Sequence, residues 1–262
     1  MVKNNNKKNN GTNALRGLLA FLVALAVFLG VELIPQLTEN LGSDNHPSYT
    51  EASDIYEGSC KSRLSLDDIA PFDGEPYIVV NGNVPFFTEA DITTEPFELF
   101  SELDDLGRCG TAYANVCQEL MPTEKRGSIG MVRPSGWQLA KYDFVDGKYL
   151  YNRCHLLGYQ LTGENANVKN LITGTRYLNV TGMLPFENEI ADYVHETNNH
   201  VLYRVTPVFE GDNLVANGVL MEALSVEDDT IEFCVFCYNV QPGVKIDYGT
   251  GLNWADADYS AD

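Results

Sequence analysis

The amino-acid sequence predicts an α+β fold with a central antiparallel sheet and a short helical insert. Three runs rich in β-branched and aromatic residues follow one another near the C-terminus, at residues 201–209, 214–224 and 231–240. A Gly-Asp-Asn turn at 211–213 separates the first two. A helical segment precedes these runs and does not alternate with them, so the strands are expected to pair as an antiparallel meander.

Further strands are expected before the helical segment. Residues 77–80 are a short β run that ends in an Asn-Gly turn signal, and residues 148–151 are a strand that leads directly into 152–155. The stretch 129–137 contains two glycines and a proline, so strand and loop are expected there. Residues 98–106 are expected to be a short helix or irregular.

The helical insert is predicted as two adjoining segments. Residues 174–183 can be helical, and Pro185 is expected to stop that helix and to open the next, over 186–196. A last short strand is expected at 245–248. The second helix has apolar residues at helical spacing, namely Ile190, Ala191 and Val194.

The N-terminal part of the chain predicts segments outside the folded domain. Residues 1–16 are rich in Asn and Lys, and 17–35 are almost entirely apolar. A basic flank before such a run predicts a cytoplasmic tail and a transmembrane signal anchor; a cleaved signal peptide, giving a secreted form, is the alternative. Residues 36–70 are polar and acidic and predict a flexible tether. Residues 71–262 are then an extracellular domain.

Charge is distributed unevenly along the chain. The net charge of −20 disfavours binding of nucleic acid over the whole surface, because phosphates are repelled. Residues 125–182 are locally basic within this acidic chain, with eight basic and three acidic residues. The middle of the chain is therefore the expected site for contact with phosphate. Its basic residues are Lys125, Arg126, Arg133, Lys141, Lys148, Arg153, Lys169 and Arg176.

The sequence has six cysteines. An even count in an exported chain permits disulfides, and Cys109 and Cys117 are close enough to close a small loop. Cys234 and Cys237 form a Cys-x-x-Cys motif without a second such pair, so buried free thiols are favoured over a zinc site there.

The stretch Asn152-Arg153-Cys154-His155, with Asn179 downstream, carries the groups that phosphodiester hydrolysis needs. A neutral His can deprotonate water at physiological pH. An amide oxygen can bind a hard divalent cation that keeps several waters, and Arg can grip phosphate through two hydrogen bonds. Glu187 lies eight residues after Asn179, a little over two helical turns, so it could face the same side.

From about residue 122 to residue 248 the chain resembles the DNA/RNA non-specific endonucleases, and within them the membrane-anchored DNA-entry nucleases of Gram-positive bacteria. Their signature Asp-Arg-Gly-His, continuing Leu-Leu-Gly-Tyr, stands here as Asn-Arg-Cys-His-Leu-Leu-Gly-Tyr at 152–159. The family's Lys-Asn pair, followed nine residues later by an Asn, appears as Lys169-Asn170 and Asn179.

The resemblance implies a ββα-metal (His-Me finger) site with one Mg²⁺, or Mn²⁺ in its place, that cuts DNA and RNA to leave 5′-phosphates. His155 and Arg153 would be the catalytic residues, with His155 as the general base, and Asn179 would bind the metal. Glu187 would bind the metal or one of its waters. A DNA-uptake machinery is a candidate partner. The candidates for substrate contact are Arg126, Arg133, Asn170 and Arg176, with a loop-fixing role as the alternative for Asn170.

Two positions of the signature depart from the family. Asn152 stands where the family has Asp, so a supporting hydrogen bond can be kept but its charge is lost. Cys154 stands where the family has Gly. These changes motivate a rival hypothesis, a catalytically inactive homologue that serves as an extracellular nucleic-acid or protein-binding module. A thiol hydrolase built on Cys154 and His195 is a further alternative.

Overall fold

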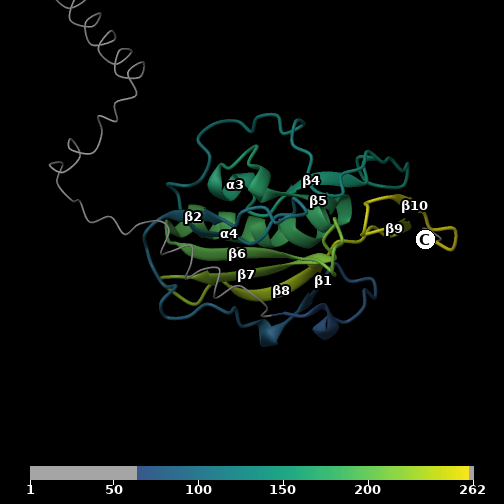
Figure 1. Cartoon of the computed structure of the whole chain (residues 1–262). Coiled ribbons are helices and arrows are strands. Elements are labelled where there is room, and N and C mark those ends of the chain that lie inside the picture. Colours follow the sequence, from purple (N-terminus) through teal and green to yellow (C-terminus); the bar gives the residue numbers. More distant parts are fainter. Residues whose placement is uncertain (1–63, 260–262) are drawn as a thin grey trace, which may run out of the picture. The chain divides into compact units, whose positions relative to one another are not determined.

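A six-stranded antiparallel sheet is the centre of the computed structural model, which describes residues 64–259. The strand order is β1-β8-β7-β6-β3-β2, so the predicted meander of the last three long strands is present as β6, β7 and β8 (Figure 1). The predicted α+β fold is confirmed. The strands of this sheet are β1 (Tyr77–Val79), β2 (Phe97–Phe100), β3 (Ala112–Val116), β6 (Val201–Val208), β7 (Gly218–Ser225) and β8 (Glu232–Tyr238).

A second layer covers one face of this sheet. It consists of the hairpin β4 (Tyr151–His155) and β5 (Leu171–Thr175), the short helices α3 (Tyr159–Thr162) and η3 (Val168–Asn170), and the helical pair η4 (Leu178–Met183) and α4 (Leu184–Thr197). Figure 1 shows α4 lying along the sheet, with β4, β5 and α3 beyond it. The main core lies between the layers. It includes Ile190 and Val194 of α4 together with Val205, Met221 and Val235 of the sheet.

The helix α4 follows from its sequence. Pro185 lies in its first turn, and the predicted apolar residues Ile190, Ala191 and Val194 are buried. Asn198 ends the helix in the left-handed conformation, at φ 61°, and its N–H donates to the Val194 carbonyl oxygen. The expected break at Pro185 is wrong, because the backbone stays helical through Met183 and Leu184. The preceding segment η4 is a π-helix, a wider turn that is often found at functional sites.

Several expected boundaries also differ. Of the two alternatives for 98–106, the helix is wrong: residues 98–100 belong to β2 (Phe97–Phe100), which pairs with β3 at the edge of the sheet, and residues 101–106 are irregular. The strand β3 was not predicted: all five of its residues are buried, so the alternation that marks a half-exposed strand is absent. The helix predicted from residue 174 starts later, because 171–175 form β5. The expected last strand is β9 (Val244–Ile246), which pairs with β10 (Asn253–Ala255).

Residues 64–70 take part in a smaller core on the sheet. Leu66 begins the one-turn helix η1 (Leu66–Asp68), and together with Leu64 and Ile69 it packs on the cluster around Phe236 and Tyr238. A second short helix, η2 (Asn81–Asn83), follows β1 at the predicted Asn-Gly turn. Ordered packing therefore includes the residues just before position 71.

The predicted tail, anchor and most of the tether lie outside the described residues. Between residues 64 and 259 no helix has the length and apolar character needed to cross a membrane. The expectations for 1–16, 17–35 and 36–63 therefore remain predictions.

Candidate active site

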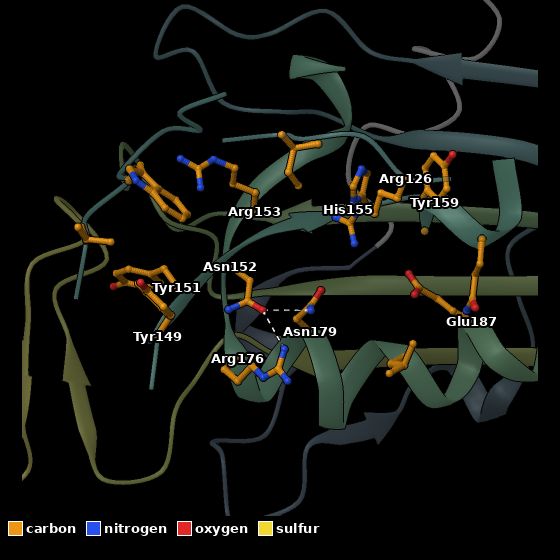
Figure 2. Close-up of a pocket in the computed structure, with 16 residues that line it drawn as sticks. Arg126, Tyr149, Tyr151, Asn152, Arg153, His155, Tyr159, Arg176, Asn179 and Glu187 are labelled. Carbon is orange, nitrogen blue, oxygen red and sulfur yellow. Dashed lines mark hydrogen bonds between the residues drawn. The ribbon is translucent and has the colours of Figure 1, made fainter. Parts of the chain in front are cut away.

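A cleft of about 710 Å³ lies beside the β4–β5 hairpin and the start of α4. It brings together residues that are up to 61 positions apart in the chain, from Arg126 to Glu187. Figure 2 shows the side chains of His155, Asn179 and Glu187 pointing toward a common space. Seven of the predicted site residues line this cleft: Arg126, Asn152, Arg153, His155, Arg176, Asn179 and Glu187.

His155 is held in one orientation by hydrogen bonds at both ring nitrogens. Its Nδ1 lies 3.1 Å from Arg126 Nη2, and its Nε2 lies 2.8 Å from the Asn165 carbonyl oxygen. A guanidinium can only donate and a carbonyl can only accept, so Nε2 carries the proton and Nδ1 is the basic nitrogen. Burial lowers the pKa of His155 to about 4; the bond to Asn165 opposes this effect, and the charge of Arg126 adds to it.

Asn179, on η4, is linked to both unusual positions of the signature. Its Nδ2 donates to Asn152 Oδ1 over 3.3 Å (Figure 2), and its Oδ1 accepts from the Cys154 thiol over 3.1 Å. The Cys154 side chain is fully buried, and Gly174 of β5 makes room for it: a Cβ at Gly174 would lie 2.6 Å from Cys154 Cβ. Asn152 also accepts from Arg176 Nη1 over 3.4 Å.

Glu187 presents a buried carboxyl group to the cleft. It lies against the backbone of Gly158, where an added Cβ would be 2.8 Å from the carboxyl carbon. Burial raises the pKa of Glu187 to about 8, although the charge of Arg126 opposes this. Within the described part of the chain the carboxyl group has no hydrogen-bond or ion-pair partner. A cation in the cleft would offset the cost of ionising this buried group.

The donor atoms in the cleft fit a hard divalent cation. Asn179 Oδ1 and the Glu187 carboxylate are both oxygen ligands, which Mg²⁺ prefers. Two side-chain ligands suffice for Mg²⁺, because this ion keeps several of its waters. The unpartnered state of Glu187 is the observation that supports the fit.

The three arginines of the cleft have different attachments. Arg153 donates to the backbone oxygens of Val132 and Gly130 and stacks on Trp137, with its guanidinium carbon 4.1 Å from the ring centroid. It therefore fastens the 130–137 loop to β4. Arg176 forms an ion pair with Asp146 over 2.7 Å, on the exposed rim.

Two predicted residues lie away from the cleft. Arg133 is exposed and is not among the lining residues. Asn170 is fully buried; its Oδ1 accepts from the Leu157 N–H and its Nδ2 donates to the Leu157 carbonyl oxygen. Its predicted substrate contact is out of reach, because both ends of the amide are used to fix the loop after His155. Neither Cys154 nor His195, the pair of the alternative thiol hydrolase, is among the residues that line the cleft.

Three contributors to the site were not predicted. Asn165 orients His155 through a backbone oxygen, which no side-chain pattern can indicate. The Trp137 ring stacks against the Arg153 guanidinium. Tyr159 lines the cleft, and its hydroxyl donates a hydrogen bond to the Glu124 carbonyl oxygen. Tyr159 is the last residue of the extended signature, so the motif itself was the available signal.

All five described cysteines are free and buried, Cys234 and Cys237 among them. Cys109 and Cys117 do not form the disulfide that their spacing would allow. Cys109 instead donates to the Leu171 carbonyl oxygen over 3.2 Å.

Comparison with known proteins shows which family the chain belongs to. A deoxyribonuclease of Streptococcus dysgalactiae subsp. equisimilis is 32% identical over 108 residues, a match that covers 39% of this chain and 32%, about a third, of that protein. The structure of NucA from Streptococcus agalactiae with bound magnesium is similar in fold, with a TM-score of 0.63, 24% identity, and coverage of 79% of this chain and 96% of that one. The structure of the Sda1 nuclease with bound zinc gives a TM-score of 0.58, 25% identity, and coverage of 70% and 97%. Residues 89–227 match the DNA/RNA non-specific endonuclease family, and the chain belongs to that family.

Proposed function

We propose that this protein is a Mg²⁺-dependent endonuclease that hydrolyses phosphodiester bonds of DNA and RNA with little sequence preference, leaving 5′-phosphate and 3′-hydroxyl ends. The observation that carries this proposal is the convergence of His155 Nδ1, Asn179 Oδ1 and the unpartnered Glu187 carboxylate on one cleft. These groups supply a base and a cation site side by side.

His155 is suited to activate water. The Asn165 carbonyl oxygen holds the Nε2 proton, so Nδ1 is left to accept a proton from an attacking water. As the ring becomes cationic, the same carbonyl oxygen stabilises the positive charge. The ring is uncharged at neutral pH because burial lowers its pKa to about 4.

Asn179 and Glu187 would hold the metal ion. When bound, Mg²⁺ supplies positive charge that stabilises the phosphorane and the leaving 3′ oxygen. The magnesium in NucA and the zinc in Sda1 support a divalent ion for this chain, and the oxygen donors favour Mg²⁺, with Mn²⁺ as a substitute.

The arginines would bind the phosphate backbone. Without substrate, the Arg126 guanidinium donates a hydrogen bond to His155 Nδ1. A phosphate oxygen would bind this guanidinium in place of His155, so Nδ1 could then accept a proton from water. Arg176, on the rim, would contact a neighbouring phosphate. Contacts to phosphate alone carry no sequence information, which accounts for non-specific cleavage. The net charge of −20 makes the affinity low and sensitive to salt.

The proposed location is the outer face of the cell membrane. The basic flank and the apolar run at 17–35 support a single-pass anchor with residues 71–262 as the extracellular nuclease domain, or a secreted form if the run is cleaved. In that position the enzyme would meet DNA from outside, and a DNA-uptake machinery would be its partner.

The test is degradation of plasmid DNA and of RNA in Mg²⁺ and in EDTA. Wild type should cut both in Mg²⁺ only, and His155→Ala and Asn179→Ala should each lose about 100-fold or more in rate. Arg133→Ala, an exposed residue outside the cleft, is the matched control and should keep its activity. Cleavage that persists in His155→Ala would refute the assignment of the base.

A second candidate function has one observation in its favour. The Cys154 thiol donates to the oxygen with which Asn179 would bind the metal, so the chain could be an inactive homologue that binds nucleic acid or protein. Absence of Mg²⁺-dependent cleavage by folded wild type, with nucleic-acid binding retained, would favour this function.

A further inference from the structure

A cluster of three metal-ligand side chains lies away from the cleft described above. Cys117 follows β3, and His200 precedes β6; because Val116 pairs with Val201, the antiparallel register brings the two residues opposite each other. Glu119 adds a carboxylate from the turn after β3, which is closed by the Leu120 N–H donating to the Cys117 carbonyl oxygen. The three residues line a hollow of about 340 Å³.

The ligand atoms are already close together. One atom from each of Cys117, Glu119 and His200 lies within 4.8 Å of the others. Cys117 Sγ is 3.6 Å from Glu119 Oε2. In a tetrahedral zinc site with bonds of about 2.3 Å to sulfur and about 2.1 Å to oxygen, these two atoms would be about 3.6 Å apart. The existing separation therefore suits zinc without movement of the turn.

His200 is held by Glu227 through its backbone and one ring nitrogen, so the other ring nitrogen can serve as a ligand. Glu227, after β7, accepts the His200 backbone N–H over 2.9 Å with one oxygen and lies 2.6 Å from ring Nδ1 with the other. A carboxylate accepts, so Nδ1 carries the proton, and in the neutral ring Nε2 has the free lone pair. A carboxylate behind a ligating histidine is the usual outer partner in zinc sites, because it fixes the ring and raises its basicity.

The chemistry of the three ligand atoms indicates which metal they suit. The set of one sulfur, one imidazole nitrogen and one carboxylate oxygen is too soft for Mg²⁺ and suits Zn²⁺ or Co²⁺. It leaves a fourth position for water.

We infer that Cys117, Glu119 and His200 form a second metal site, for zinc or a similar transition metal, that is separate from the Mg²⁺ cleft. Binding releases the thiol proton of Cys117 and ties the turn after β3 to the start of β6. The ion stabilises this end of the sheet in proportion to its free concentration. The inference does not depend on the proposed nuclease activity.

Cobalt spectroscopy tests this site directly. Co²⁺ is added to the full chain, purified in detergent, with Mg²⁺ in large excess to fill the cleft. We expect a thiolate-to-cobalt charge-transfer band in the near ultraviolet that one equivalent of Zn²⁺ abolishes. Cys117→Ser should lose the band. Glu119→Gln and His200→Gln should weaken Co²⁺ binding by about tenfold or more. Cys154→Ala and Cys109→Ser are matched thiol controls and should keep it.

The thermal stability of the protein with and without Zn²⁺ gives a second test, which remains valid if Cys117→Ser or His200→Gln folds poorly. Glu119 is exposed, so Glu119→Gln should fold normally, and Zn²⁺ should raise the melting temperature of wild type in Mg²⁺ but not that of Glu119→Gln. Absence of the band in wild type would overturn the inference. So would a band that survives in Cys117→Ser, or one that disappears in Cys154→Ala, because the thiol beside Asn179 would then be the ligand.

Discussion

The Cys154 thiol donates a hydrogen bond to the side-chain oxygen of Asn179, over 3.1 Å. The oxygen that faces a metal in the proposed mechanism is therefore partly used by a residue that replaces the glycine of the family signature. This contact joins the two departures of the motif, because Asn179 donates in turn to Asn152. A metal bound by Asn179 would have to compete with this neutral hydrogen bond.

Cys154→Ala should lower the Mg²⁺ concentration needed for half-maximal cleavage by about fivefold, since a lost competing hydrogen bond is worth about 1 kcal/mol. The measurement is the initial rate of plasmid cleavage against Mg²⁺ concentration. Cys237→Ala is the matched control: its thiol is equally buried and contacts Met221, but it does not touch Asn179. An unchanged Mg²⁺ dependence in Cys154→Ala would show that this bond does not limit metal binding.

Gly158→Ala should impair metal binding through Glu187. The new Cβ would lie 2.8 Å from the Glu187 carboxyl carbon, so the carboxylate has to move. We expect the Mg²⁺ requirement to rise by about tenfold, as for loss of a metal ligand's support. The control is Gly130→Ala, where the nearest atom to the new Cβ is 3.7 Å away, an ordinary contact. Equal behaviour of the two variants would argue against Glu187 as a ligand.

The pH dependence of stability should report the buried state of His155. Its folded pKa, about 4, is below the ordinary value of 6.5, so the unfolded chain binds more protons between these values. Stability should therefore fall as pH is lowered from 6.5 toward 4, with His155 contributing on the order of 2–3 kcal/mol of that loss. Urea unfolding in EDTA at pH 7 and pH 4.5 measures it. His155→Gln should show a smaller difference between the two, and an identical difference would contradict the burial effect.

Much of the fold and site could be predicted because the signals are local. The signature at 152–159 is one continuous segment, and Asn179 and Glu187 follow its last residue by 20 and 28 positions. The strand β3 could not be predicted, since it is covered on both faces and lacks alternation. The role of Asn165 depends on a backbone oxygen, and the burial of Asn170 depends on how the loop folds back on Leu157. The Cys117–Glu119–His200 cluster required the pairing of β3 with β6, which no local pattern contains.

Arg126 and Arg153 both line the cleft, yet their removal should have different consequences. Arg153 holds backbone oxygens at 130 and 132 and stacks on Trp137, so Arg153→Ala should lower both activity and the free energy of unfolding, the latter by about 2 kcal/mol. Arg126 contacts His155 Nδ1 and is proposed to turn toward phosphate. Arg126→Ala should lower kcat/KM by about 100-fold and change stability little. It should also raise the pKa of His155, because the charge of Arg126 contributes to its lowering.

The two variants are separated by urea unfolding, by steady-state cleavage rates, and by NMR titration of the His155 ring. Arg126→Lys keeps the charge but not the paired donors, so it should restore the low pKa of His155 without restoring full activity. If Arg126→Ala instead loses stability as Arg153→Ala does, Arg126 is a structural residue. In that case the phosphate grip must come from Arg176, whose guanidinium reaches the cleft from the Asp146 ion pair on its rim.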